Sequence, residues 1–132
     1  MITKGHIKTK AKKPHGYRLK QIEDVLADLR DKCEYKTVIR ERGFSRFPTV
    51  TQTLFKVVGI CDLVFKDVEI VEIPPTTVKK TITGSGKADK GDVEKNVRKA
   101  LGLSKTTKFA TDDESDAAAV CLAYLIRGGL ID

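Results

Sequence analysis

Apolar residues recur at helical spacing in four stretches of the chain: residues 17–33, 49–66, 90–101 and 111–129. The second stretch is apolar around most of its circumference, so it is predicted to be a largely buried helix. Pro48 precedes it, in the position that favours the start of a helix. The first stretch is clearly amphipathic, and its apolar face is made of Leu19, Ile22, Val25, Leu26, Leu29 and Cys33.

Short strands are predicted between these helices. Residues 37–39 are all β-branched. The run stops abruptly at the charged residues that follow. Residues 68–73, VEIVEI, are β-branched apolar residues interrupted by two glutamates, which predicts a strand, and two prolines end it. Residues 76–82 form a short helix or turn. A weaker alternation over residues 2–9 indicates a short edge strand.

Glycine and cysteine positions add two expectations about packing. Gly59 lies in the middle of a helix, where it costs about 1 kcal/mol against alanine, so a close neighbour is expected there. Cys33, Cys61 and Cys121 are far apart and lack the close spacing of a zinc site. They are expected to be small core residues in a reducing compartment. No apolar run approaches the ~20 residues that a membrane helix needs.

The 132-residue chain, one domain by its length, has a formal net charge of +7 that is unevenly placed. Residues 1–20 contain basic side chains and no acidic ones, and further basic groups follow at 40–46 and 79–99. A basic surface beside a concentrated acidic cluster suits a nucleic-acid enzyme, because the surface binds phosphates while the carboxylates hold a cation. A generic basic surface is the alternative.

The acidic cluster opens the last predicted helix. Asp112, Asp113, Glu114 and Asp116 crowd its first turn, where the helix dipole favours negative charge. Asp113 and Asp116 are three residues apart and share one face, which could hold a divalent cation through hard oxygen ligands. Simple capping of the helix start explains the same residues, and the cluster alone does not decide between the two.

Glu41 follows the strand at 37–39 and is flanked by Arg40 and Arg42. A carboxylate at the carboxyl end of a buried strand is a favoured place for chemistry in open α/β sheets. An exposed ion pair with either arginine is an equal alternative from this segment alone. The sequence offers no Ser/His/Asp or Cys/His set for nucleophilic catalysis, and its GSGK segment lacks the spacing of a phosphate loop.

Two motifs together carry a resemblance to a known family. The first is V-K-K-x-x-T-G-x-G-K-A-D-K-x-x-V over residues 78–93, and the second is D-x-x-D-A-A-A-V-C-L-A-Y-L from residue 113. With the order of helices and strands, they resemble the RuvC-type Holliday-junction resolvases, which are RNase H-like nucleases. The resemblance runs from about Gly5 to Ile126.

The resemblance implies an α/β fold of the RNase H type, a mixed sheet flanked by helices. The whole of 1–132 would be a single nuclease domain, with a basic strand and loop over 1–16 and the core over 17–132. Its implied function is Mg²⁺- or Mn²⁺-dependent, structure-selective cleavage of four-way DNA junctions in recombination and repair. The resemblance also implies a homodimer that does not bind a membrane. Its implied location is the cytoplasm of a bacterial or phage-infected cell.

The family's site, two metals held by four carboxylates, is carried over residue by residue. Glu41, Asp113 and Asp116 would be metal ligands, Asp112 could replace Asp113, and Lys90 would assist catalysis near the junction phosphates. Phe44 matches an aromatic residue near the strand-exchange point. The DNA-binding set implied by the resemblance is Lys79, Lys80, Lys87, Lys90, Arg40, Arg42, Phe44 and Arg46.

The chain departs from the family at its beginning. The family opens with a central strand that carries its first metal-binding aspartate, whereas no acidic residue here precedes Glu23. One metal ligand and the central strand are therefore expected to be missing, which would uncover helix faces and a strand edge. We expect either a truncated product or a swapped dimer to account for the missing strand. Two further readings stay open: a branched-DNA-binding module that cannot cut, and a related nuclease acting on other branched or flapped DNA.

Overall fold

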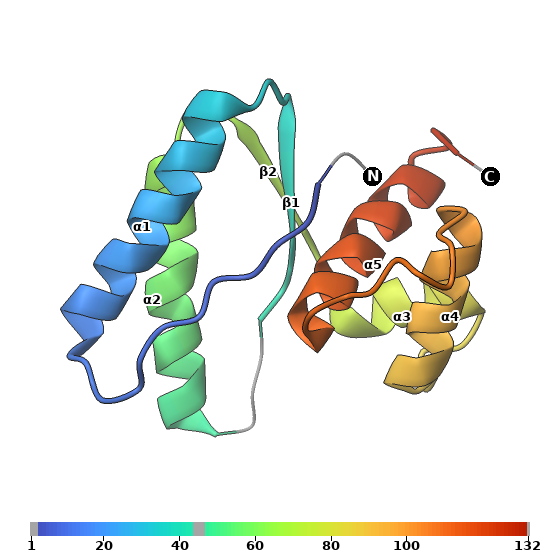
Figure 1. The fold of residues 1–132 in the computed structure, drawn as a ribbon, viewed down its shortest axis with the longest axis horizontal. Coiled ribbons are helices and arrows are strands. Elements are labelled where there is room, and N and C mark those ends of the chain that lie inside the picture. Colours follow the sequence, from blue (N-terminus) through green and yellow to red (C-terminus); the bar gives the residue numbers. More distant parts are fainter. Residues whose placement is uncertain (1–2, 44–46, 132) are drawn as a thin grey trace. The chain divides into compact units, whose positions relative to one another are not determined.

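The computed structural model describes residues 3–43 and 47–131, and these form five helices and two strands (Figure 1). The predicted helices and the strands predicted at 37–39 and 68–73 are confirmed, with ends that differ by a few residues. No helix among the described residues is long and apolar enough to cross a membrane. In chain order the elements are α1 (His15–Lys32), β1 (Thr37–Glu41), α2 (Pro48–Val64), β2 (Glu69–Ile73), α3 (Pro75–Thr83), α4 (Lys90–Ala100) and α5 (Asp112–Arg127).

The chain forms two compact units, and each is described here by itself. Unit 1 contains the described residues within 1–6, 39–42 and 72–132, and thus α3, α4 and α5. Unit 2 contains those within 7–38 and 43–71, and thus α1 and α2. The chain passes between the units through β1 and β2, so residues of each strand belong to both.

β1 and β2 pair as parallel strands, because partner residues advance together along both of them. The Thr37 hydroxyl donates to the Glu69 carboxylate, and the backbone N–H of Arg42 donates to the carbonyl of Ile73 at 2.9 Å. Helix α2 is the connection between the strands, as parallel pairing requires. Within the described ranges the sheet has these two strands only. Glu41 ends β1 and therefore lies at the carboxyl edge of the sheet.

Unit 1 holds most of the buried apolar side chains. Helices α3, α4 and α5 pack on one another (Figure 1). Val93 and Val97 lie one turn apart on α4 and are both buried, as its amphipathic pattern predicts. Asp89 caps α4 by accepting a hydrogen bond from the Asp92 N–H at 2.8 Å. The other buried apolar residues of this unit are Ile73, Val78, Ala119, Val120, Leu122 and Ala123.

Unit 2 is an α1–α2 pair that leaves much of its apolar surface in solvent. The expectation that α2 is largely buried is wrong for the described chain, since Val64 is its only buried residue. Leu63 is 61% exposed and Phe55 is 59% exposed. The hydrophobic pattern identified the apolar faces correctly, but a pattern does not supply the second surface that would cover them.

The cysteine expectation is also wrong in part. Cys33 and Cys121 are exposed, and Cys61 is half-buried. Cys33 caps the end of α1, and Cys121 lies on α5 beside an open hollow that Glu114 and Leu122 also line. A small apolar side chain at helical spacing is buried only where another element packs against that turn.

The edge strand expected over 2–9 does not form, because residues 3–10 have no regular secondary structure. Side-chain contacts hold this segment instead. Lys4 and His6 bind the carboxylate of Glu114 on α5. Further along, the carbonyl of Lys8 accepts a hydrogen bond from the Gln21 side-chain amide of α1 at 3.0 Å. This segment therefore contacts helices α5 and α1 and does not pair with a strand.

Gly59 of α2 gives the first testable prediction. Among the described residues, no neighbouring atom lies within 4 Å of the position that a Cβ would occupy, so the expected close neighbour is absent. Gly59→Ala should raise the free energy of unfolding by about 1 kcal/mol, because alanine has the better helix propensity. Chemical denaturation of both proteins measures this. A destabilised Gly59→Ala variant would instead reveal another surface packed against α2 in solution.

Candidate functional site

Four of the residues singled out in the sequence line one hollow of unit 1. Glu41, Lys79, Lys90 and Asp116 supply its charged groups, and its volume is about 200 Å³. Apolar side chains form the rest of the wall: Pro75, Val78, Val93, Ala119 and Val120. Two carboxylates and two ammonium groups, far apart in the sequence, therefore face the same polar space.

Each charged residue is positioned by the end of an element. Glu41 is the last residue of β1, and Asp116 lies in the second turn of α5. Pro75 begins α3 in the favoured first position, which sets Lys79 one turn into that helix. Lys90 is the first residue of α4, directly after the Asp89 cap. The hollow is thus built from the carboxyl end of a strand and the early turns of three helices.

Charges of both signs interact in the hollow. Partial desolvation and the negative charge of Asp116 raise the pKa of Glu41, while Lys79 and Lys90 act in the opposite direction. The Lys90 ammonium lies 3.6 Å from the Asp116 carboxylate and 4.0 Å from that of Asp112. Lys90 is 69% exposed, so its side chain can move away from this position.

The remaining predicted metal ligands lie outside the hollow. Asp113 is exposed and is not part of its wall. Asp112 is 77% exposed and approaches only Lys90. Over residues 3–43 and 47–131, no three Asp, Glu, His or Cys side chains are grouped closely enough to hold a metal ion. The structure brings Glu41 and Asp116 together and leaves Asp112 and Asp113 apart from them.

The predicted DNA-binding residues are dispersed. Lys80 and Lys87 are exposed, and Lys87 lines a second open hollow beside α4 together with Lys95 and Lys99. Arg40 is 18% exposed and pairs with Glu72 at 3.3 Å, an arrangement that the sequence did not indicate. Two other predicted residues, Phe44 and Arg46, lie outside the described residues, and Arg42 is exposed at the end of β1.

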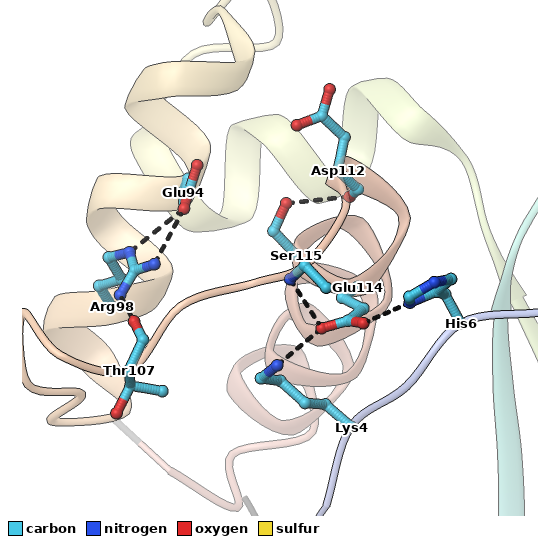
Figure 2. A network of polar contacts seen from close by, with 9 residues as sticks. Lys4, His6, Glu94, Arg98, Thr107, Asp112, Glu114 and Ser115 are labelled. Carbon is cyan, nitrogen blue, oxygen red and sulfur yellow. Dashed lines mark hydrogen bonds and ion pairs between the residues drawn. The ribbon is translucent and has the colours of Figure 1, made fainter.

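Glu114 has a different environment from its acidic neighbours. It is 4% exposed, and its carboxylate binds Lys4 at 2.7 Å and His6 at 2.6 Å (Figure 2). Hydrogen bonds from Lys4, His6 and the Ala110 N–H lower the pKa of Glu114 to about 2. Sequence reasoning grouped Glu114 with the exposed acids. No local signal distinguishes Glu114, because Ala118 and Cys121, four and seven positions later on the same stripe of the helix, are half-buried and exposed.

Comparison with known proteins identifies the family. The family model for crossover junction endodeoxyribonuclease RuvC matches residues 1–124. A RuvC of Prochlorococcus marinus subsp. pastoris is 34% identical over 127 residues, which cover 95% of this chain and 80% of the relative. A RuvC of Cutibacterium acnes is also 34% identical, over 98% of this chain and 66% of its own length.

Solved structures agree at the level of the fold. Thermus thermophilus RuvC superposes with a TM-score of 0.79 at 23% identity, covering 93% of this chain and 76% of that one. A second structure, of the same protein in complex with Holliday junction substrate, gives a TM-score of 0.78 at 20% identity. The match confirms the predicted RNase H-like α/β fold. This chain therefore belongs to the RuvC family of crossover junction endodeoxyribonucleases.

Proposed function

We propose that this chain is a Mg²⁺- or Mn²⁺-dependent, structure-selective endonuclease that resolves four-way DNA junctions. The observation that carries the proposal is the meeting of Glu41, Asp116, Lys79 and Lys90 in one hollow of a RuvC-family chain. Junctions arise in DNA recombination and repair, so we place the activity in the cytoplasm of a bacterial or phage-infected cell.

The residues of the hollow fit a hard divalent cation. Mg²⁺ is commonly bound through one or two carboxylates, with water and substrate phosphate completing its shell. Glu41 and Asp116 would hold it, and Asp113, or Asp112 in its place, would supply a further ligand from the turn before Asp116. Desolvation, followed by the negative charge of Asp116, raises the pKa of Glu41, and a cation bound between the two carboxylates would offset both effects. A bound cation of this kind acidifies water and stabilises the leaving oxygen of a phosphodiester.

The two lysines act on the substrate. Lys79 is half-buried in the wall of the hollow, and Lys90 is exposed at its edge. Both ammonium groups can bind non-bridging phosphate oxygens and offset the charge that develops during hydrolysis. Lys90 would leave the half-buried Asp116 to do so, since the exposed lysine side chain can turn toward a phosphate.

Exposed basic residues would bind the DNA arms. Within residues 3–43 and 47–131, Lys80, Lys87 and Arg42 form no ion pair with a carboxylate that DNA binding would have to break, whereas Arg40 pairs with Glu72. Contacts of this kind bind backbone rather than base sequence, so affinity should fall steeply with salt. Phe44 remains our candidate for the strand-exchange point, with Arg46 beside it on the backbone.

We further propose that the active form is a homodimer. Symmetric cutting of a four-way junction needs two sites related by a two-fold axis. Val50, Leu54, Phe55 and Leu63 of α2 are between 37% and 61% exposed, which is the kind of apolar surface that a second copy would cover.

One observation favours a second function. Among the described residues no three-ligand group for a metal is present. A chain with too few ligands would bind branched DNA without cutting it. This catalytically impaired binding module is the alternative to a working resolvase.

A nicking assay separates the two functions. The substrate is a synthetic four-way junction, with a linear duplex of the same sequence as the structural control, in Mg²⁺, Mn²⁺, Ca²⁺ or EDTA. A resolvase should give paired nicks on opposite strands of the junction, in Mg²⁺ or Mn²⁺ only. Salt-sensitive junction binding with no nicks in any metal would identify the binding module. Equal affinity for duplex and junction would contradict both.

A further inference from the structure

Glu114 is a buried charge that the proposed chemistry does not use. It lies between Asp113 and Asp116 in the sequence, yet its side chain points away from the hollow. One carboxylate oxygen accepts from the Lys4 ammonium at 2.7 Å and from the Ala110 N–H at 3.1 Å. The other oxygen lies 2.6 Å from the Nδ1 of His6 (Figure 2). A single side chain thus joins the N-terminal segment, the loop before α5 and the first turn of α5.

A second set of contacts holds the same loop from the side of α4. Arg98 pairs with Glu94 at 3.2 Å and donates a hydrogen bond to the carbonyl of Thr107 (Figure 2). The ring of Phe109 lies 5.0 Å from the Arg98 guanidinium and 5.6 Å from the Lys4 ammonium. Cations therefore contact this ring from two elements, which favours one placement of the loop.

Stability alone is a weak reason for this arrangement. A buried ion pair often contributes no more to folding than well-packed apolar residues of similar volume. Such pairs do fix one geometry, because each charge tolerates few positions once it is buried. The geometry fixed here is that of the turn that carries Asp113 and leads to Asp116.

We propose that Glu114, gripped by Lys4 and His6, is a positioning residue that orients the first turn of α5 so that Asp113 and Asp116 can bind a divalent cation. The inference rests on the proposed function of the hollow. It assigns Glu114 no contact with metal or DNA. Its effect is transmitted through the backbone of residues 112–116, much as outer partners orient metal ligands elsewhere.

The primary test measures Mn²⁺ binding to the full chain by isothermal titration calorimetry, without DNA. Glu114→Ala should weaken Mn²⁺ binding about 10–100-fold, the usual effect of removing an outer partner. Glu114→Gln should largely retain binding, because its carbonyl oxygen can still accept from Lys4 and Ala110. The matched control is Asp28→Asn, which breaks the exposed Asp28–Lys32 pair on α1 and should change nothing.

Thermal unfolding of each variant separates positioning from folding. If Glu114→Ala is folded and binds Mn²⁺ like the wild type, the inference is overturned, even if its melting temperature is lower. If Glu114→Ala does not fold, Lys4→Met decides the matter, because His6 and the Ala110 N–H still contact the Glu114 carboxylate in that variant. Weaker Mn²⁺ binding by folded Lys4→Met would support the inference, and unchanged binding would refute it.

Failure of the proposed function can be told apart from failure of the positioning role, because it affects the wild type as well as the variants. If the wild type itself binds no Mn²⁺, the metal site is refuted, and hydrogen–deuterium exchange then tests the positioning. Amides of residues 112–116 should exchange faster in Glu114→Ala or, if that variant is unfolded, in Lys4→Met, than in Asp28→Asn. Equal exchange in the variant and the control would refute the positioning as well.

Discussion

Asp116→Asn is expected to reduce junction nicking by about 10³-fold or more, since losing one carboxylate from a metal site removes several kcal/mol of transition-state stabilisation. The substitution keeps the size of the side chain and removes its charge. Asp116 is the one acid of α5 that lines the hollow with Glu41, so no other α5 carboxylate is in place to substitute for it. The measurement is the single-turnover rate of nicking in Mg²⁺, on the same four-way junction.

Junction binding provides the internal check on Asp116→Asn. Removing a negative charge near the DNA should leave affinity unchanged or slightly raise it, so lost nicking with normal binding locates the defect in chemistry. Asp67→Asn is the matched control, because Asp67 is 85% exposed and pairs only loosely with Lys66. Nicking by Asp116→Asn at the wild-type rate would show that the Asp116 carboxylate of α5 is not needed for cleavage.

Most of the secondary structure could be predicted because it depends on local patterns. Helical spacing, the proline at the start of α2 and the β-branched residues of β2 are properties of short segments, and the structure confirms the elements that they predict. The parallel pairing of β1 with β2 depends on contacts across the chain. The sequence located Glu41 and Asp116 by resemblance, but only the fold places them beside Lys79 and Lys90.

The failed expectations have a common physical cause. An apolar helix face shows where a partner could pack, and α2 has such a face while much of it is exposed. Acidity at a helix start shows that negative charge is tolerated there, and it does not show which acid turns inward. Glu114 is buried where Lys4 and His6, more than a hundred residues away, contact its carboxylate. Partners so distant in the sequence leave no local pattern to read.

Glu41→Gln should reduce nicking by a similar factor, about 10²–10³-fold, although Glu41 lies on a strand and Asp116 on a helix. Glutamine preserves the shape of the side chain and removes the charge that a cation needs. It should also weaken Mn²⁺ binding, measured by calorimetry without DNA. The control is Glu69→Gln at the exposed start of β2, which leaves the hollow intact.

Combining the two substitutions tests whether the two carboxylates work together. Groups that act as one unit show strongly non-additive effects, so Glu41→Gln with Asp116→Asn should nick about as slowly as the weaker single variant. Independent contributions would instead multiply the two losses. A fully active Glu41→Gln would mean that Glu41 is a surface partner of its neighbouring arginines. The metal would then need another ligand beside Asp116, and the binding-module alternative would gain support, because the hollow would contain one functional carboxylate instead of two.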